Sequence, residues 1–399
     1  MRGHVDSQPA MFFAIDLDSR IRRNHPLRPI KKGVDLILSE MSEHFDRAYA
    51  HRGRPGVPPE VLLKLMLLQG LYGIASEAQL IERLETDLLF RWFCGLDPAE
   101  DTPDATAFSH NRQRFIDHDL TGVFFAAVTQ RVIDRQLVSK DPFSVDGTLF
   151  QSHASMKSVL PNEQADALEK KERSENNDSP NDSSGDSSGG FMPRNPSVDF
   201  RGQKRTNQTH RSVVDPDAKL YRKSQGSPSV LGHLGHILVD NRNGIIVGLK
   251  LSEANGTAER EAALAMLDDL KARHQIDPQT LGADAGYDAG AFMMGLAKRG
   301  VTPHIAMARD ARPGGKGRRQ KSDRPLIAAR LLNDRRKLRD PGYAISQRKR
   351  KKVEEPFGWL KAFAGLGKAR LIGRDKIQQQ WQMAASALTL IRMRNLLMD

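Results

Sequence analysis

The period of the apolar residues changes once along this chain, and that change limits the folds open to it. Residues 58–138 follow a helical period. "PPEVLLKLMLLQGLYG" (58–73) begins with prolines, and "SEAQLIERLETDLLFRWFCGL" (76–96) repeats large apolar residues every four positions. Two more helices are expected over 102–115 and 120–138. The pattern predicts a helical N-terminal unit, which we assign to residues 1–138.

Beyond residue 138, strand patterns alternate with helical ones, which indicates a second, α/β unit over residues 139–399. A hairpin is expected where "DNRNG" joins two apolar runs. The apolar-rich helix near the C-terminus is expected to pack on this second unit rather than to form a dimer contact. The expected strands cover 142–154, 235–241, 244–251, 280–288 and 301–307, and the expected helices cover 257–274, 290–300 and 380–398.

A polar tract interrupts the second unit soon after its first strand. "SENNDSPNDSSGDSSGG" (174–190) is rich in Ser, Asn, Asp and Gly and has no large apolar residue. Such a composition cannot bury enough apolar surface to offset the entropy of ordering. We therefore expect a disordered insertion at about 157–195.

Positive charge is concentrated in one part of the chain. The protein has a net charge of +12, whereas residues 309–376 alone hold 22 Lys or Arg against 7 Asp or Glu. A solvated basic loop would explain a single charge run. Here a Gly- and Arg-rich segment, "RPGGKGRRQKSDR" (312–324), precedes the run Arg348–Lys352. The presence of both basic segments indicates that the protein binds a polyanion.

Other classes are disfavoured by composition. The one cysteine, Cys94, excludes a disulfide framework and a Cys-rich zinc site, and it is interpreted as a buried thiol. There is no signal-peptide core at the N-terminus and no apolar run of 18 residues. We expect a soluble cytoplasmic protein with no membrane role.

Two aspartates follow strand patterns, Asp146 in "FSVDGT" and Asp284 in "GADAGY". Small neighbours leave each carboxylate accessible to a hard cation such as Mg²⁺, which takes one or two carboxylates together with phosphate oxygens and water. An Asp–Gly pair after a strand more often forms only a turn, and a turn is what we predict for Asp240.

A third carboxylate is sought in "QRKRKKVEEPFGWLK" (347–361), where five basic residues precede two acids. On a regular helix starting at Arg350, Glu354 falls at about 40° and Lys361 at about 20°, whereas Glu355 falls at about 140°. Arg350, Glu354 and Lys361 would then share one stripe. An ordinary Arg–Glu surface pair gives the same spacing, and Pro356 is compatible only with the first turn of a helix.

These motifs together resemble the bacterial insertion-sequence transposases of the DDE type, in the insertion-sequence-four and insertion-sequence-five superfamily. The resemblance includes Arg350, Glu354 and Lys361 at the family's spacing, and extends to "SVDGT", "GADAGYD" and "HILVDNRNGIIVGLKLSEANGTAERE". It spans most of residues 10–397 apart from the polar insertion. One departure is Gln347, where the family often has Tyr; Tyr343 lies four residues earlier.

The resemblance implies a ribonuclease-H-like catalytic domain behind the helical N-terminal domain. It implies that Asp146, Asp284 and Glu354 are catalytic and hold two Mg²⁺ or Mn²⁺ ions. Arg350 and Lys361 would contact transposon-end DNA. The expected activity is cleavage at the terminal inverted repeats and strand transfer into target DNA, by a homodimer on DNA in the bacterial nucleoid.

Further DNA contacts are expected from the rest of the basic run, Arg348, Lys351 and Lys352. Arg112 and Arg114, in "FSHNRQRF" (108–115), are candidates for end recognition, although a solvated helix face explains them equally well. Two other functions stay open: an inactive or domesticated DNA-binding relic, and a metal-dependent nuclease without strand transfer.

Overall fold

The computed structural model describes residues 16–50, 56–139, 141–177, 205–222, 228–306 and 324–398, which form two compact units. The helical unit contains the described residues up to Val138 together with Gly358–Gly365 and residues from Gln379 onward. The sheet unit contains Ser139–Phe357 and Leu366–Gln378. The Gly- and Arg-rich segment 312–324 lies outside the described residues except at its last position.

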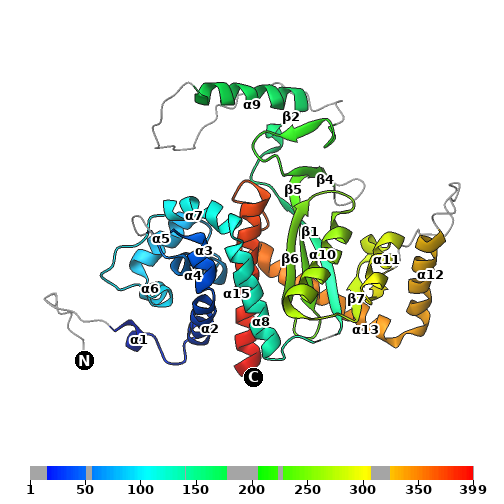
Figure 1. Cartoon of the computed structure of the whole chain (residues 1–399), viewed down its shortest axis with the longest axis horizontal. Coiled ribbons are helices and arrows are strands. Elements are labelled where there is room, and N and C mark those ends of the chain that lie inside the picture. Colours follow the sequence, from blue (N-terminus) through cyan, green and yellow to red (C-terminus); the bar gives the residue numbers. More distant parts are fainter. Residues whose placement is uncertain are drawn as a thin grey trace, which may run out of the picture. The chain divides into compact units, whose positions relative to one another are not determined.

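The helical unit is built around α4, which is buried on all sides because nearly every side chain from Val61 to Leu71 is buried. Phe90, Phe93 and Phe124 from other helices complete its core. Along the chain (Figure 1) its helices are α1 (Leu17–Arg20), α2 (Leu27–Glu40), α3 (Ser42–Ala48), α4 (Pro59–Tyr72), α5 (Glu77–Thr86), α6 (Leu88–Cys94), α7 (Thr106–Asp117) and α8 (Leu120–Asp134).

The helix expected over 76–96 is in fact two helices, α5 and α6. Asp87 separates them, because its backbone N–H donates to the Arg83 carbonyl at the end of α5 while its side chain accepts from Leu89 N at 2.9 Å and caps α6. The remaining helices expected up to residue 138 are confirmed in type. Cys94 is confirmed as a buried thiol, and burial raises its pKa to about 12.

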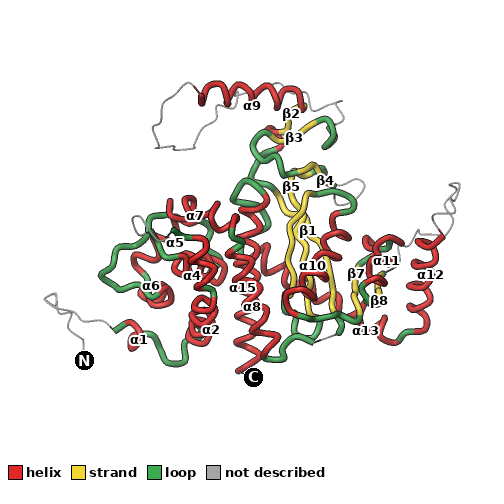
Figure 2. The backbone as a smooth tube through the Cα atoms, viewed as in Figure 1, coloured by secondary structure: helices red, strands yellow, loops and turns green. Residues whose placement is uncertain are grey.

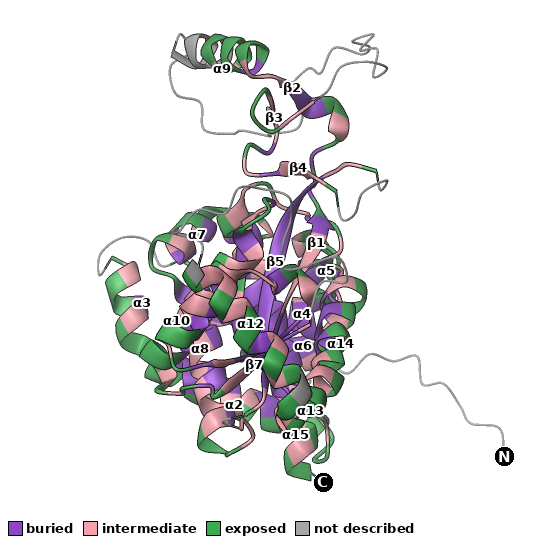
Figure 3. Ribbon diagram, turned by 90° about the vertical axis from the view of Figure 1, so that its right-hand side faces the viewer, coloured by how far each residue is buried: buried purple, intermediate pink, exposed green. Residues whose placement is uncertain are grey.

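The sheet unit contains a mixed sheet in the order β6-β5-β1-β7-β8 (Figure 2). β1 pairs antiparallel with β5 and parallel with β7, and β7 is parallel to β8. Every residue of β5 after Val230 is buried (Figure 3). The strands are β1 (Phe143–Gln151), β4 (Lys219–Tyr221), which also pairs with β5, β5 (Val230–Asp240), β6 (Ile246–Glu253), β7 (Thr280–Ala283) and β8 (Thr302–Ile305).

Helices pack on this sheet and connect its strands. α10 (Ala258–His274) contacts β5 and β6, and α13 (Pro341–Arg350) contacts β1, β7 and β8. α11 (Gly290–Lys298) and α12 (Arg324–Arg339) pack against each other and against β8. The expected alternation of strands and helices is therefore confirmed as an α/β unit.

The expected insertion at about 157–195 is partly structured. Its first part contains β2 (Val159–Pro161), which pairs with β3 (His210–Ser212), and α9 (Asn162–Asn177). The expectation of disorder is wrong for this part, because Val159 is buried in a small cluster with Ala154, Ala218 and Leu231. Residues 178–204, which include most of the polar tract, lie outside the described residues.

The last helix, α15 (Arg374–Met398), packs differently from the sequence expectation. Met383, Ala387 and Leu390 are buried in the core of the helical unit. Gly70 of α4 permits this contact, since a Cβ there would lie 3.2 Å from the Cβ of Ala387. A domain boundary that gives all of 139–399 to the second unit therefore misplaces residues 379–398.

Among the described residues no single helix is long and apolar enough to cross a membrane; α4 and α5 pass such a test only as a pair, bent by 97°.

Two glycines that end helices provide a matched stability test. Gly73 has φ 63° and a Cβ there would lie 2.5 Å from the carbonyl oxygen of Phe363, whereas Gly95 has φ 79° and open space. Both alanine variants carry left-handed backbone strain of about 1 kcal/mol. Gly73→Ala also forces a steric overlap, so we expect it to lose a further ~1–3 kcal/mol in denaturant unfolding. Equal losses in the two variants would contradict this packing.

Candidate active site

Strand register brings the two predicted aspartates together. Phe143 pairs with Leu281 and Ser144 with Gly282 in the parallel ladder between β1 and β7. Continued by two residues, the same register sets Asp146 opposite Asp284. Asp146 accepts from Gly147 N at 2.8 Å, and Asp284 accepts from Gly286 N at 2.8 Å, so each carboxylate is oriented by the backbone that follows it.

The charges of other acidic groups act on Asp146. Burial is the largest cause that raises its pKa to about 6, and the charge of Asp284 is the next. Glu354 raises the pKa further, whereas the Gly147 N–H and the Arg350 guanidinium lower it. Burial and neighbouring like charges both raise the pKa of a carboxyl group, and carboxyl groups with raised pKa values are frequent in functional sites.

Glu354 reaches the sheet through a change of helix type. α13 ends at Arg350, a 3₁₀ turn covers Lys351–Val353, and α14 (Glu354–Gly358) follows. Val353 is fully buried and this turn contacts β1. Gly282 allows α13 to approach β7, because a Cβ there would lie 2.9 Å from Ser346 Oγ.

The regular helix assumed over 350–361 is therefore wrong. The segment passes from α13 through the 3₁₀ turn and α14 into a π-helix at Trp359–Phe363, so a rotation of 100° per residue does not apply. Lys361 belongs to the helical unit and Glu354 to the sheet unit. The charge of Glu354 nevertheless raises the pKa of Asp146.

A fourth carboxylate, Glu259, was missed by the sequence reasoning. It lies in the first turn of α10, and the charges of Asp284 and Asp146 raise its pKa after the larger effect of burial. The signal was available in "NGTAERE", where Asn255 caps the start of α10 by accepting from Ala258 N at 2.7 Å. Only the fold shows that this turn points toward the two aspartates.

Two buried polar rings border the carboxylates. His236 pairs with Gly147 across the β1–β5 ladder, and burial together with Lys250 lowers its pKa to about 4, so the imidazole is neutral. Burial and the nearby Glu259, Asp146 and Asp284 raise the pKa of Tyr287 well above its ordinary value, so its phenol keeps its proton.

The donor set suits a hard divalent cation. Carboxylate oxygens are the ligands that Mg²⁺ and Mn²⁺ prefer. Three other carboxylates act electrostatically with Asp146: Asp284 and Glu354 raise its pKa, and Asp146 raises the pKa of Glu259. Within the described ranges, no three His, Cys, Asp or Glu side chains are close enough to ligate one ion without moving. Repulsion between like charges opposes such closure in the cation-free protein.

The basic run places its side chains at the end of α13 and in the 3₁₀ turn. Arg348, Lys351 and Lys352 are exposed, and Lys352 Nζ donates to the Arg242 carbonyl at 3.3 Å. Arg350 is half-buried, and its buried Nε has no hydrogen-bond partner among the residues that the structure describes. Together they provide cationic groups next to Glu354.

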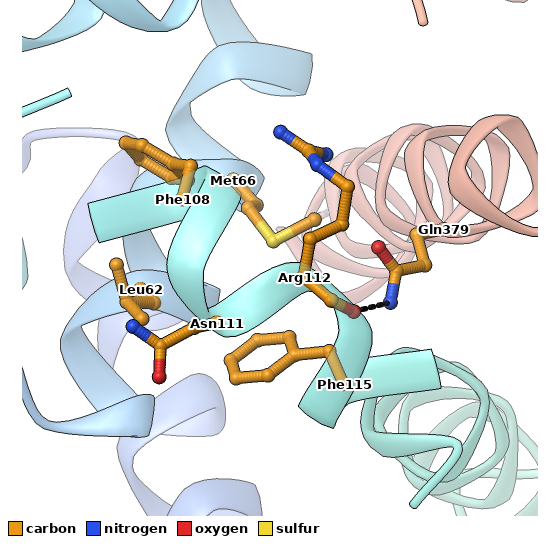
Figure 4. Close-up of a pocket in the computed structure, with 7 residues that line it drawn as sticks. All are labelled: Leu62, Met66, Phe108, Asn111, Arg112, Phe115 and Gln379. Atoms are coloured by element: carbon orange, nitrogen blue, oxygen red, sulfur yellow. Dashed lines mark hydrogen bonds between the residues drawn. The ribbon is translucent and has the colours of Figure 1, made fainter. Parts of the chain in front are cut away.

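Arg112 and Arg114 do not form a comparable surface. Arg112 is buried and paired with Glu77, and its carbonyl oxygen accepts from the Gln379 side chain at 3.3 Å (Figure 4). Arg114 donates to Asn111 at 2.7 Å and stacks over Tyr49. Both side chains therefore make packing contacts within the helical unit.

Hydrogen bonds show the roles of Asp240, Gln347 and Tyr343 in the fold. The turn reading of Asp240 is confirmed, because its carboxylate accepts from Asn243 N at 2.9 Å and from Ser139. Gln347 donates to the backbone carbonyls of Ala283 and His304, and Tyr343 donates to Ile305 O at 2.6 Å. Both side chains therefore tie α13 to the ends of β7 and β8.

Comparison with known families gives two matches. Residues 15–114 match a transposase domain (DUF772), and residues 207–390 match the transposase DDE domain. The chain belongs to the DDE transposases of the insertion-sequence type. No curated protein and no solved structure matches it.

The raised pKa of Asp146 predicts a pH dependence of stability in chelator-treated protein. Native Asp146 keeps its proton up to about pH 6, while the unfolded carboxyl releases it near 3.8, so the free energy of unfolding falls as the pH rises through this window. The effect of this group is about 3 kcal/mol, from a shift of its pKa from 3.8 to about 6. Denaturant unfolding from pH 3.5 to 7 measures it, and Asp146→Asn should remove it. An identical pH profile in the variant would contradict the assignment.

Proposed function

We propose that this protein cleaves DNA at the ends of a mobile element and joins the freed 3′ ends to target DNA. The observation that carries the proposal is the β1–β7 register, which sets Asp146 opposite Asp284, while the charge of Glu354 raises the pKa of Asp146. The match to the transposase DDE domain supports it. The strand order, three antiparallel strands followed by two parallel ones, supports a ribonuclease-H-like fold.

The spacing of Arg350, Glu354 and Lys361 supports a place in the insertion-sequence-four and insertion-sequence-five superfamily. In the proposed site, Asp146, Asp284 and Glu354 would hold two Mg²⁺ or Mn²⁺ ions. When bound, such ions supply a Lewis acid that lowers the pKa of the attacking water and stabilises the leaving oxygen.

The chain's own residues orient the DNA for two displacements. In the first, a water oxygen forms a bond to the scissile phosphorus, the bond from phosphorus to the 3′ oxygen breaks, and that oxygen leaves as a 3′-hydroxyl. In the second, this hydroxyl attacks a target phosphodiester and releases a new 3′-hydroxyl. The guanidinium of Arg350, next to the acidic groups, is positioned to pair with a phosphate beside the one under attack.

The first test replaces each carboxylate with its amide, which keeps the side-chain shape. Asp146→Asn, Asp284→Asn and Glu354→Gln should each reduce cleavage and strand transfer on labelled element ends by roughly a thousandfold or more, because each removes a charge from the site. DNA binding should persist, as measured by a gel-shift assay.

Glu355→Gln is the matched control, since Glu355 is the adjacent carboxylate and, unlike Glu354, is not proposed to hold the cations. It should retain activity. Loss of cleavage in Glu355→Gln with retention in Glu354→Gln would refute the assignment of Glu354. Salt-sensitive binding without cleavage by the wild type would leave a DNA-binding relic, and cleavage without joining would leave a nuclease.

The basic run should set the salt dependence of DNA binding. Each phosphate contact adds about 0.9 to the slope of log K against log salt concentration. Replacing both Arg348 and Lys351 by alanine should therefore lower that slope by about two for specific and nonspecific duplexes alike. Lys170→Ala, which removes an exposed charge from α9, should leave the slope unchanged. An unchanged slope in the double variant would exclude these residues as phosphate contacts.

A further inference from the structure

Glu259 points its carboxylate at the backbone that follows both catalytic aspartates. A Cβ added to Gly147 would lie 2.9 Å from Glu259 Oε1, and one added to Gly286 would lie 3.6 Å from Glu259 Oε2. Gly147 directly follows Asp146, and Gly286 lies two residues after Asp284. The carboxylate therefore lies between the part of β1 that carries Asp146 and the turn that follows Asp284, and a side chain at Gly147 would crowd it.

Nothing in the described part of the chain compensates this carboxylate with a hydrogen bond or an ion pair. The charge of the adjacent Arg260 lowers the pKa of Glu259, but its guanidinium donates to the backbone carbonyls of Gly256 at 2.8 Å and Gly286 at 3.4 Å rather than to this carboxylate. Glu259 is only half-exposed, and the neighbouring Asp146 and Asp284 have the same charge. Keeping a partly buried carboxylate next to like charges destabilises the protein unless a cation joins them.

A second and independent observation points to a polar ligand at this place. His236 is fully buried, its Nδ1 has no partner among the described residues, and that atom would lie 3.1 Å from a Cβ at Gly147. Its Nε2 lies 2.6 Å from Ser252 Oγ, whose hydroxyl donates to the Glu253 carbonyl. The imidazole therefore donates through Nε2, which leaves Nδ1 as an acceptor for a hydrogen atom of water.

We propose that Glu259 is a fourth carboxylate of the divalent-cation site, with His236 Nδ1 accepting a hydrogen bond from a cation-bound water. The inference rests on the proposed function, because it assumes that Asp146, Asp284 and Glu354 bind divalent cations. It extends that function by giving the chain four acidic residues for its ions rather than three.

A purely structural role for Glu259 makes a different prediction. A carboxylate in the first turn of a helix is stabilised by the helix dipole, and Glu261 occupies the same turn of α10 but is exposed. If Glu259 served only to interact with the helix dipole, neutralising Glu259 or Glu261 would lower the free energy of unfolding by a similar amount and leave cation binding unchanged. Glu261→Gln is therefore the matched control for Glu259→Gln.

The test measures cation binding by the full chain without DNA. Wild type, Glu259→Gln, Glu261→Gln and Asp146→Asn are freed of metal with a chelator and titrated with Mn²⁺ or Mg²⁺ while thermal unfolding is followed. We expect Glu259→Gln to raise the melting temperature of the cation-free protein, because a repulsive charge is removed. We expect its affinity for Mn²⁺ to fall by roughly tenfold to a hundredfold, while Glu261→Gln behaves as wild type.

The other outcomes are distinguishable. Unchanged Mn²⁺ affinity in Glu259→Gln, with the affinity lost in Asp146→Asn, would overturn the role of Glu259 and leave the three-carboxylate site intact. The absence of cation binding by the wild type would overturn both the fourth carboxylate and the proposed catalytic function. Equal destabilisation of the cation-free protein by the Glu259→Gln and Glu261→Gln variants, with unchanged affinity, would show that the helix dipole explains Glu259.

Discussion

The parallel pairing of β1 with β7 is the constraint on which the candidate site depends. It sets the carboxylates of Asp146 and Asp284 opposite each other at adjoining strands, although 137 residues separate them in the sequence. The antiparallel pairing of β1 with β5 adds His236 beside Gly147. A slip of one residue in either ladder would turn these side chains to the other face of the sheet. The register of the strands therefore keeps these side chains on one face.

The acidic cluster is electrostatically unfavourable without a counterion, and the surrounding structure is what holds it together. Burial and the charge of Asp284 raise the pKa of Asp146 to about 6, and Asp284 and Asp146 also raise the pKa of Glu259. Backbone N–H groups at Gly147 and Gly286 orient two of the carboxylates, and Arg350 offsets part of the charge. Repulsion between carboxylates held close together is typical of sites that bind a cation together with a charged substrate. A run of five basic residues just before Glu354 is consistent with a charged substrate at this site.

Close approach of elements, rather than composition, sets the helical part of the site. Gly282 lets Ser346 of α13 approach β7, and the buried Val353 fixes the 3₁₀ turn ahead of Glu354. The prediction that Glu354 belongs to the site used the geometry of one regular helix, and that geometry is wrong. The rotation of 100° per residue does not apply to this segment, because it changes from α-helix to a 3₁₀ turn, a short α-helix and a π-helix.

Local patterns in the sequence were enough to predict the two types of unit, the strand that ends just before Asp284, the turn role of Asp240 and the basic run near Glu354, because periodicity and turn chemistry are local properties. The predicted strand end at Asp146 was wrong, because β1 continues past Asp146 to Gln151 in its antiparallel pairing with β5. The break at Asp87 was locally encoded but overlooked, since an aspartate that ends one helix and caps the next leaves the apolar spacing unbroken. Tertiary structure alone decided that α15 completes the helical core, that Arg112 is buried against Glu77, and that Glu259 faces the two aspartates. These three facts depend on contacts between residues far apart in the sequence, and no local pattern specifies which partner a buried or charged side chain will meet.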